Sequence, residues 1–310
     1  MVLASTIVNK IPSNLKFAIT AGIGLFIAII ALLNANVVVA SESTTVALGE
    51  LSSPTVVLSL VGLLIIGALQ HYKVPGGILL GILITWVLGI IAQLVGWYVP
   101  NPEAGVYSVI PQFSLSSFEA PKMFQFDFGF IAKNVPAFIL IVFTFLYTDI
   151  FDTVGTLIGV AEKGKLLDKD GSLPNATGAL MADAVGTVVG ACFGTSTVTS
   201  YVESSAGVAA GGRTGLTAVT TAVLFFISLI FAPIFTSIPS FATTPAMLYV
   251  GLLMLSSIRQ VKFDGDIADA IGAFLAIIMM PLTYSIANGI MFGIVSWVIL
   301  KLVTGKAKDI

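Results

Sequence analysis

The sequence predicts an all-α membrane protein that crosses the bilayer several times. Of its 310 residues, 57% are hydrophobic and only 10% are charged, and the mean hydropathy is +1.04. A soluble domain of ordinary composition has about 25% charged residues. This chain therefore lacks the charge needed to cover a surface that faces water, and we expect the lipid bilayer to surround it.

Long uncharged runs define the predicted membrane helices, since a helix needs about 20 apolar residues to cross the hydrocarbon. Proline interrupts the hydrogen-bond ladder of a helix. Pro233 and Pro239 therefore place a turn in one long run, and Pro281 divides another. We expect about ten helices. Five lie in residues 17–41, 51–70, 74–102, 136–160 and 184–202, and a sixth begins near Ser200. Residues 214–258 and 270–300 each contain two more.

The basic residues predict the orientation, because lysine and arginine are enriched on the cytoplasmic side of a membrane. With both termini in the cytoplasm, only Lys122 and Lys133 of the 14 basic residues fall outside. Both lie in the longest loop, residues 100–135, which we expect at the outer surface. The sequence thus predicts a multi-pass protein of the cytoplasmic membrane with cytoplasmic N- and C-termini.

The composition also excludes several classes of function. A net charge of −2 gives no basic field for nucleic acid. One cysteine, Cys192, and one histidine, His71, exclude an intramolecular disulfide and a Cys/His zinc site. We expect no metal, no cofactor and no enzymatic activity. An intramembrane aspartyl protease would need two aspartates facing each other from two helices, whereas Asp149 and Asp152 are expected on one helix.

Intramembrane acids are costly and usually face a cavity or a pathway. Asp149 and Asp152 are three residues apart in FLYTDIFDTVGTLIGV, so they share one helix face. Thr153 and Thr156 extend this polar stripe. The alternative interpretation is a pair of carboxylates that hydrogen-bond to neighbouring helices and serve packing alone.

A second polar group lies in GTSTVTSYVESSAGVAAGGRTG. Its Thr, Ser and Val content favours extended backbone, so we expect one short mid-membrane strand at residues 195–200. Such backbone is tolerated at membrane depth only where it is buried or lines a cavity. Glu203 then begins a half-helix of small residues whose positive end would point at that cavity. The alternative is that these small residues simply allow tight helix packing.

The remaining polar residues receive structural interpretations. Asp183 is expected to hold two helices in register through hydrogen bonds, and Asn288 to satisfy the backbone broken near Pro281. Glu162 ends its helix beside Lys163 and Lys165, and we expect it to be solvated. Three further acids precede a helix, where their charge favours its N-terminus, namely Asp264, Asp266 and Asp269.

The two polar motifs carry a specific resemblance. FLYTDIFDTVGTLIGVAEKGKLL and GTSTVTSYVESSAGVAAGGRTGLTAV resemble bacterial purine permeases of the AzgA-like branch of the nucleobase:cation symporter-2 family. The resemblance covers essentially the whole chain. It implies a fold of fourteen segments in two inverted repeats of seven, in which each repeat gives four segments to a transport core and three to a gate.

The resemblance also implies a division of this chain, which begins where the family's fifth segment begins, so the first four segments are expected to be absent. Residues 1–99 would form the first gate triplet, and residues 100–135 the extracellular or interfacial loop. Residues 136–233 would form the second half of the core. Residues 234–310 would form the second gate triplet and the cytoplasmic tail.

The function implied by the resemblance is transport of a purine nucleobase (guanine, hypoxanthine or adenine), with uptake coupled to protons and driven by movement of the core relative to the gate. A homodimer through the gates is implied as well. The alternatives are a non-transporting fragment or assembly partner, and a channel or exchanger of the same architecture. Asp152 is expected to serve proton coupling or to form a hydrogen bond with the strand at residues 195–200. The residues expected to bind the base are Glu203, Asp149, Thr195, Ser196 and Thr197.

Overall fold

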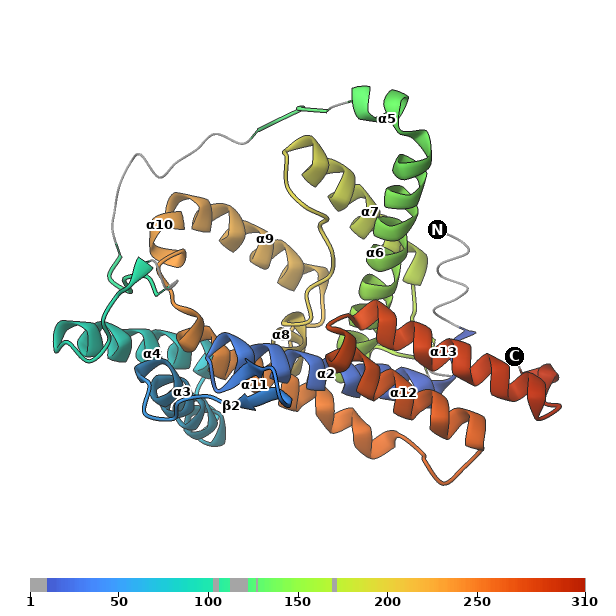
Figure 1. Ribbon diagram of the computed structural model, residues 1–310, viewed down its shortest axis with the longest axis horizontal. Helices are drawn as coiled ribbons and strands as arrows, with labels where there is room; N and C mark the ends of the chain where they lie inside the picture. Colours follow the sequence, from blue (N-terminus) through green and yellow to red (C-terminus); the bar gives the residue numbers. More distant parts are fainter. Residues whose placement is uncertain (1–9, 103–105, 112–121, 127, 169–171, 310) are drawn as a thin grey trace. The chain divides into compact units, whose positions relative to one another are not determined.

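The computed structural model describes residues 10–102, 106–111, 122–126, 128–168 and 172–309, and these are mainly helical (Figure 1). The longer elements follow the predicted runs. They are α2 (Ser13–Asn34), α3 (Pro54–His71), α4 (Gly77–Leu94), α6 (Val135–Gly164), α7 (Ala176–Cys192), α9 (Gly215–Ile230), α11 (Ser240–Leu255), α12 (Ile267–Thr283) and α13 (Ile286–Val303). The short elements are strands β1 (Val38–Ser41) and β2 (Thr45–Leu48), helices α5 (Gly129–Lys133), α8 (Ser204–Ala209) and α10 (Ala232–Phe235), and 3-10 turns η3 (Ser256–Gln260) and η4 (Ala307–Asp309).

The helical membrane fold is confirmed. Within the described ranges, six helical segments are long and apolar enough to cross a bilayer, and α7, α9 and α12 are shorter apolar helices. Several boundaries differ from the prediction. The helices expected to reach residues 41 and 102 end at Asn34 and Leu94, and the helix expected from near Ser200 is the six-residue α8. The helix expected at residues 184–202 is α7, which ends at Cys192 and begins at Ala176. The uncharged run ended at Asp183, but the helix continues through this residue because its carboxylate finds hydrogen-bond donors inside the protein.

The prolines break the long runs where the sequence predicts. The short helix α10, with Pro233 in its first turn, and the turn at Pro239 separate α9 from α11. Helix α12 extends two residues beyond Pro281, and Tyr284 then takes a left-handed conformation with φ 54°. Ser285 caps the next helix, since its Oγ accepts a hydrogen bond from the backbone amide of Asn288 at 3.2 Å.

The chain forms two compact units. The first comprises residues 1–26, 120–211 and 253–310, and the second comprises residues 27–119 and 212–252. Parts of both units lie outside the described residues, including residues 112–121 of the predicted outer loop. These units describe packing alone, and the division into gate triplets and core stays a prediction.

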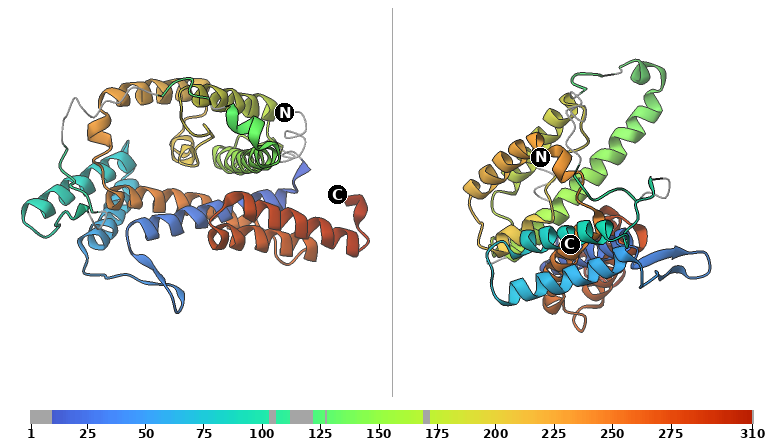
Figure 2. Two further views of the ribbon diagram at one scale, coloured as in Figure 1. Left: turned by 45° about the horizontal axis from the view of Figure 1, so that its top comes forward. Right: turned by 90° about the vertical axis from the view of Figure 1, so that its left-hand side faces the viewer.

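The first unit is built on close contact between α12 and α13, which lie side by side (Figure 2). A Cβ atom placed on Gly272 would lie 3.0 Å from the carbonyl oxygen of Gly293, so small residues allow these two backbones to approach. Helix α6 packs against α13. Gly155 meets Ile290 of α13 and Ile23 of α2, which brings the three helices together.

The second unit packs α3 against α4 and against the start of α11. Phe241 is fully buried beside Tyr98, with ring centroids 5.6 Å apart. The segment that follows α4 is tied back to it, because Trp86 Nε1 donates a hydrogen bond to the carbonyl of Val109 at 2.8 Å. Helix α9 contributes no buried residue to this unit.

The paired strands differ from the expected one. Strands β1 and β2 form an antiparallel hairpin with Val38 opposite Leu48 and Ser41 opposite Thr45. Residues 195–200 are non-helical, as predicted, but they form no strand ladder within the described part of the chain. Their backbone runs alone along α7, because side chains and the end of that helix supply their hydrogen bonds.

A network of charged residues joins the beginning of α12 to the end of α13. Lys301 is buried, and its Nζ lies 3.1 Å from Asp266 Oδ2 and 3.4 Å from Asp269 Oδ1. Lys306 reaches the same Asp266 oxygen at 2.6 Å, and Trp297 Nε1 donates to Asp269 Oδ1 at 2.6 Å. The predicted role of Asp266 at a helix N-terminus is confirmed, since its Oδ1 accepts from the backbone amide of Ala268.

This network predicts how stability depends on Lys301 and on acid. Replacing Lys301→Met should lower the melting temperature by several degrees, because Asp266 and Asp269 then face each other without the buried cation. Hydrogen bonds from Lys306, from the Ala268 amide and from Lys301 hold the pKa of Asp266 well below its usual range. Its contribution to stability is therefore complete above the unfolded pKa of about 3.9 and is lost as the pH falls below it.

Thermal unfolding of the purified protein between pH 7 and pH 3 measures both effects. Lys308→Met is the matched control, since Lys308 is exposed and forms no ion pair within the described residues. Equal melting temperatures for the Lys301 and Lys308 variants would contradict a stabilising role for the network.

Candidate functional site

The predicted acidic stripe lies along the second half of α6. Asp149 and Asp152 are half-buried on this helix, and Thr153 and Thr156 beside them are buried. The first half of α6 is almost entirely exposed. The two aspartates thus lie where the helix passes from an exposed surface into the packed interior of the first unit.

Asp183 is the centre of a hydrogen-bond network that joins three segments. Thr153 of α6 lies 3.0 Å from Asp183 Oδ2 on α7 and 2.7 Å from the hydroxyl of Thr199. The backbone amide of Ser200 donates to Asp183 as well. Because Thr153 gives its proton to Asp183, Thr199 is the donor in the bond between the two threonines. This half-buried carboxylate and its donors hold the helices and the non-helical segment in one arrangement.

The non-helical segment packs into a groove made by two glycines of α7. Val198 contacts the positions of Gly186 and Gly190, where a side chain would collide with it. The carbonyl of Val198 accepts a hydrogen bond from Thr187 at 3.1 Å. Three residues of this segment predicted to bind substrate are exposed, namely Thr195, Ser196 and Thr197.

Asp149 and Asp152 retain unused hydrogen-bonding capacity. One carboxylate oxygen of each, Oδ1, is buried and has no hydrogen-bond partner among the described residues. Asp152 also accepts a bond from the backbone amide of Ala287, in the first turn of α13. Asp149 is within electrostatic range of both Asp152 and Asp183. Buried acceptors without a partner are uncommon in proteins and call for a ligand, water or a proton.

Glu203 precedes the six-residue helix α8, as the sequence predicts, and its side chain is exposed. Helix α8 packs against α6, where Val208 meets Gly164. No contact within the described part of the chain joins Glu203 to Asp149 or Asp152. The structure therefore brings their helices together, while the three carboxylates remain separate.

The break near Pro281 is satisfied differently from the expectation. Asn288 is half-buried in the first turn of α13, and it is its backbone amide that takes part in capping. The acceptor is Ser285, which directly precedes the helix. Serine at this position is the usual N-cap, because its hydroxyl reaches the free amides of the first turn.

The expectation that Glu162 is solvated is wrong. Its Oε2 accepts a hydrogen bond from Ser257 at 2.6 Å, and its Oε1 accepts one from Gln260 at 2.7 Å. Lys163 beside it donates to Ser256 at 2.6 Å. The end of α6 is thus fastened to η3, because η3 presents several donors and acceptors where α6 ends.

One face of α6 therefore has a continuous set of partners. Asp152, Gly155, Gly159 and Glu162 follow a spacing of three, four and three residues, which places them on one side of a helix. The acids at the two ends form hydrogen bonds, and the glycines between them admit neighbouring side chains, including Met254 against Gly159. We refer to these four residues as the α6 contact face.

Comparison with known proteins identifies the family. The model of a Permease family matches residues 1–292. The chain belongs to this family. It is 40% identical to the adenine permease AdeQ of Escherichia coli over 98% of its own length, and 43% identical to the guanine/hypoxanthine permease PbuO of Bacillus subtilis over 99%. The matches cover 65% and 69% of those relatives, so this chain spans about two thirds of their length.

The family and the apolar helices make this chain a multi-pass membrane protein. The sequence correctly predicted that the two aspartates share one face of a helix, but it gave no prediction of Thr199 and Glu162 as hydrogen-bonding centres. The spacing of the α6 contact face was a usable signal for Glu162. Thr199 had no comparable signal, because its partner Thr153 lies 46 residues away along the chain.

The close contact at the glycines of α7 gives a direct prediction for this chain. A Cβ atom on Gly190 would lie 2.7 Å from Thr195 Oγ1 and 2.8 Å from Val198 Cγ2, so the non-helical segment would have to move. Gly190→Val should destabilise the protein by about 1–3 kcal/mol, the usual cost of overpacking. Thermal unfolding of the purified protein measures the change.

Gly207→Ala provides the control, because nothing lies within 4 Å of the added methyl group on α8. That variant should be neutral or slightly stabilised, since alanine favours the helix over glycine by about 0.5–1 kcal/mol. If Gly190→Val were as stable as Gly207→Ala, the close packing of residues 195–199 on α7 would be refuted.

Proposed function

We propose that this permease transports a purine nucleobase, with the acids of α6 and Glu203 at its binding site. The observation that carries the proposal is the pair of buried Oδ1 atoms on Asp149 and Asp152, which have no partner within the described residues. The class of substrate is supported by relatives named adenine permease and guanine/hypoxanthine permease. The proposed site has three acids, Asp149, Asp152 and Glu203, and no basic side chain among its described residues. It therefore disfavours an anion and favours a neutral substrate that offers hydrogen-bond donors.

The chemistry of a purine suits such acceptors. A carboxylate can accept hydrogen bonds from two adjacent N–H groups at once, and bonds to a charged partner are the stronger kind. We assign Glu203 and Asp149 to the base, with the exposed residues Thr195, Ser196 and Thr197 offering backbone and hydroxyl groups to its other edge. Asp152 is assigned to proton coupling, because a carboxylate shielded from water can exchange a proton during a transport cycle.

The α6 contact face suggests how movement and binding are linked. In the proposed division, α6 belongs to the core, whereas α2, α11, η3 and α13 belong to the gates. The contact face would then be a boundary between core and gate, with glycines in its middle and a hydrogen-bonded acid at each end. We propose that this boundary slides during transport, that both termini are cytoplasmic, and that gates of two chains form a homodimer.

Direct binding tests the function. Purified protein in detergent should bind guanine, hypoxanthine or adenine in isothermal titration, and cells without their own purine permeases should accumulate the same labelled base when they produce the chain. Absence of binding to all three bases by folded protein would refute the proposed site.

Carboxamide substitutions separate the roles of the acids. Glu203→Gln and Asp149→Asn should each weaken purine binding by about 1–3 kcal/mol, which is about 5- to 150-fold, because one acceptor oxygen becomes a donor. Asp152→Asn should leave the affinity nearly unchanged but remove the dependence of uptake on pH. Titration at several pH values, together with uptake, measures these effects.

Glu162→Gln serves as the control for this series, because it makes the same chemical change at an acid outside the proposed site. It should bind purine like the unmodified protein. Unchanged affinity in Glu203→Gln would remove Glu203 from the site, and loss of pH dependence in Asp149→Asn but not Asp152→Asn would exchange the two aspartate roles.

The same Glu162→Gln variant tests the boundary itself. The carboxylate of Glu162 uses one oxygen for Ser257 and the other for Gln260, whereas the amide of glutamine has a single oxygen. One of the two hydrogen bonds to η3 is therefore lost, and η3 should be held less firmly. Hydrogen–deuterium exchange at residues 256–260 should become faster. Lys165→Gln is the matched control, since Lys165 is exposed at the end of the same helix. Equal exchange in both variants would show that Glu162 does not fasten α6 to η3.

A further inference from the structure

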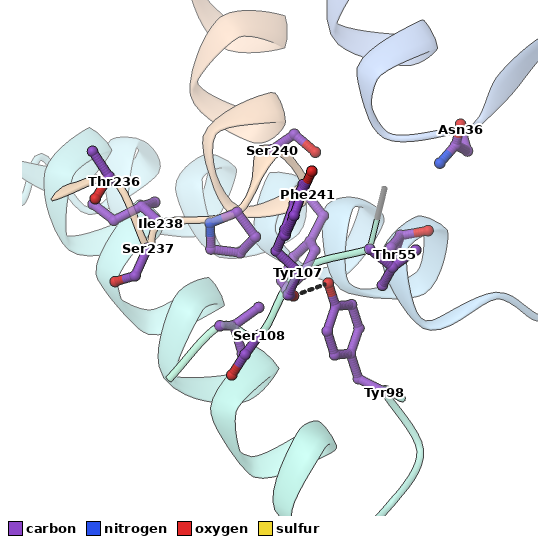
Figure 3. A pocket seen from close by; sticks show the side chains of 13 residues that line it. Asn36, Thr55, Tyr98, Tyr107, Ser108, Thr236, Ser237, Ile238, Ser240 and Phe241 are labelled. Carbon is purple, nitrogen blue, oxygen red and sulfur yellow. Dashed lines mark hydrogen bonds between the residues drawn. The ribbon is translucent and has the colours of Figure 1, made fainter. Parts of the chain in front are cut away.

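A cavity in the second unit lies apart from every acid discussed above. Its volume is about 240 Å³, and it is enclosed by residues 106–109, which follow α4, and residues 236–241, which precede and begin α11 (Figure 3). Tyr98, Val109 and Phe241 are buried in its wall, whereas Tyr107 is 68% exposed. A more open hollow beside it, of about 410 Å³, shares Tyr107, Ser108, Thr236 and Ser237.

Four hydroxyl groups in the wall of this cavity have already used their protons. Tyr98 donates to the carbonyl of Tyr107 at 2.9 Å, and Ser240 donates to the carbonyl of Asn34 at 3.1 Å. Thr236 and Ser237 donate to the carbonyls of Ala232 and Ile234 at 2.9 and 2.6 Å. A hydroxyl has one proton and two lone pairs. These four oxygens can therefore only accept a hydrogen bond from a molecule in the cavity.

The cavity is neutral, and acceptors outnumber donors in its wall. None of the described residues that line it is charged, and they include three aromatic side chains, Tyr98, Tyr107 and Phe241. Asn36 and Tyr107 are lining residues that can still donate, through an amide and a hydroxyl group. Burial raises the pKa of Tyr98, so its hydroxyl keeps its proton and its bond to Tyr107 at physiological pH. A neutral wall of acceptors and rings suits a flat, uncharged molecule that carries hydrogen-bond donors.

The size of the cavity limits the ligand further. Pockets for drug-sized molecules have volumes of about 300–1,000 Å³, so this one suits a smaller molecule, of the size of one fused heterocycle. Among purine bases, guanine carries a ring N–H directly beside an exocyclic amino group. Hypoxanthine lacks that amino group, and in adenine the amino group lies between ring acceptors. Guanine therefore has more donor hydrogens than the other two bases, and four hydroxyls that can only accept favour it.

We propose that this cavity is a second binding site, which takes a neutral purine rich in N–H donors, guanine before hypoxanthine and adenine. The choice of purine rests on the proposed function, whereas the preference for donors rests on the hydroxyl oxygens alone. Residues 100–135 and 234–243 are predicted outside, so the site would hold a base at the outer end of the protein. It differs chemically from the proposed transport site, which binds through carboxylates.

Protection of an introduced thiol tests this site. In full-length protein with Cys192→Ser, the change Ile238→Cys adds a reporter to the cavity wall without removing any of the four hydroxyls. Guanine should slow its reaction with a maleimide several-fold, and hypoxanthine and adenine should slow it less. Ser228→Cys on α9, outside the cavity, should react equally with and without guanine. Equal rates at residue 238 with and without guanine would overturn the proposal.

Two further changes separate this site from the transport site. Ser237→Ala removes one acceptor and should raise the guanine concentration needed for half protection at least several-fold, whereas Ser228→Ala, which removes an equivalent hydroxyl outside the cavity, should not. Thr236→Val gives the same test if Ser237→Ala unfolds. Glu203→Gln should leave protection intact. Loss of thiol protection in Glu203→Gln would overturn the second site. If protection persists while isothermal titration finds no role for the acids, the proposed transport site alone would be refuted.

Discussion

In an apolar environment every polar group of a protein must find its partner inside the protein, because lipid offers none and each unsatisfied group costs several kcal/mol. The helices meet this requirement for most of the backbone. Where they stop, side chains replace the missing partners, as Ser285 does at the start of α13. Residues 195–200 follow the same rule, since Thr187 and Asp183 of α7 supply a donor and an acceptor to their backbone.

Asp149 and Asp152 are two exceptions to this constraint. Asp183 is surrounded by donors and is therefore committed to structure, whereas Asp149 and Asp152 each keep one buried oxygen without a partner within the described residues. The two acids of α6 can thus still bind a donor, whereas Asp183 on the neighbouring helix α7 already has its donors. This difference, rather than the number of acids, is the physical basis for the proposed binding site on α6.

Glycines decide where these polar groups can meet. Gly186 and Gly190 allow the non-helical segment to lie against α7, and Gly155 and Gly159 allow α6 to approach its neighbours. Without a side chain, each leaves room for a close contact that positions an adjacent polar residue. The acceptors of the cavity in the second unit arise in a different way, because carbonyls of the short helix α10 accept hydrogen bonds from the hydroxyls of Thr236 and Ser237.

The sequence by itself determined the membrane class, most helix boundaries and the shared face of Asp149 and Asp152, because hydropathy, proline positions and helical spacing are local properties. It also determined the family, through two long motifs. Only the tertiary structure decided that Glu162 forms hydrogen bonds with η3 and that Lys301 pairs with two acids near the start of α12. The same is true of the hydrogen bonds that join Asp183, Thr153 and Thr199. These pairings depend on how separate helices pack, and no local pattern specifies which distant donor will reach a given carboxylate.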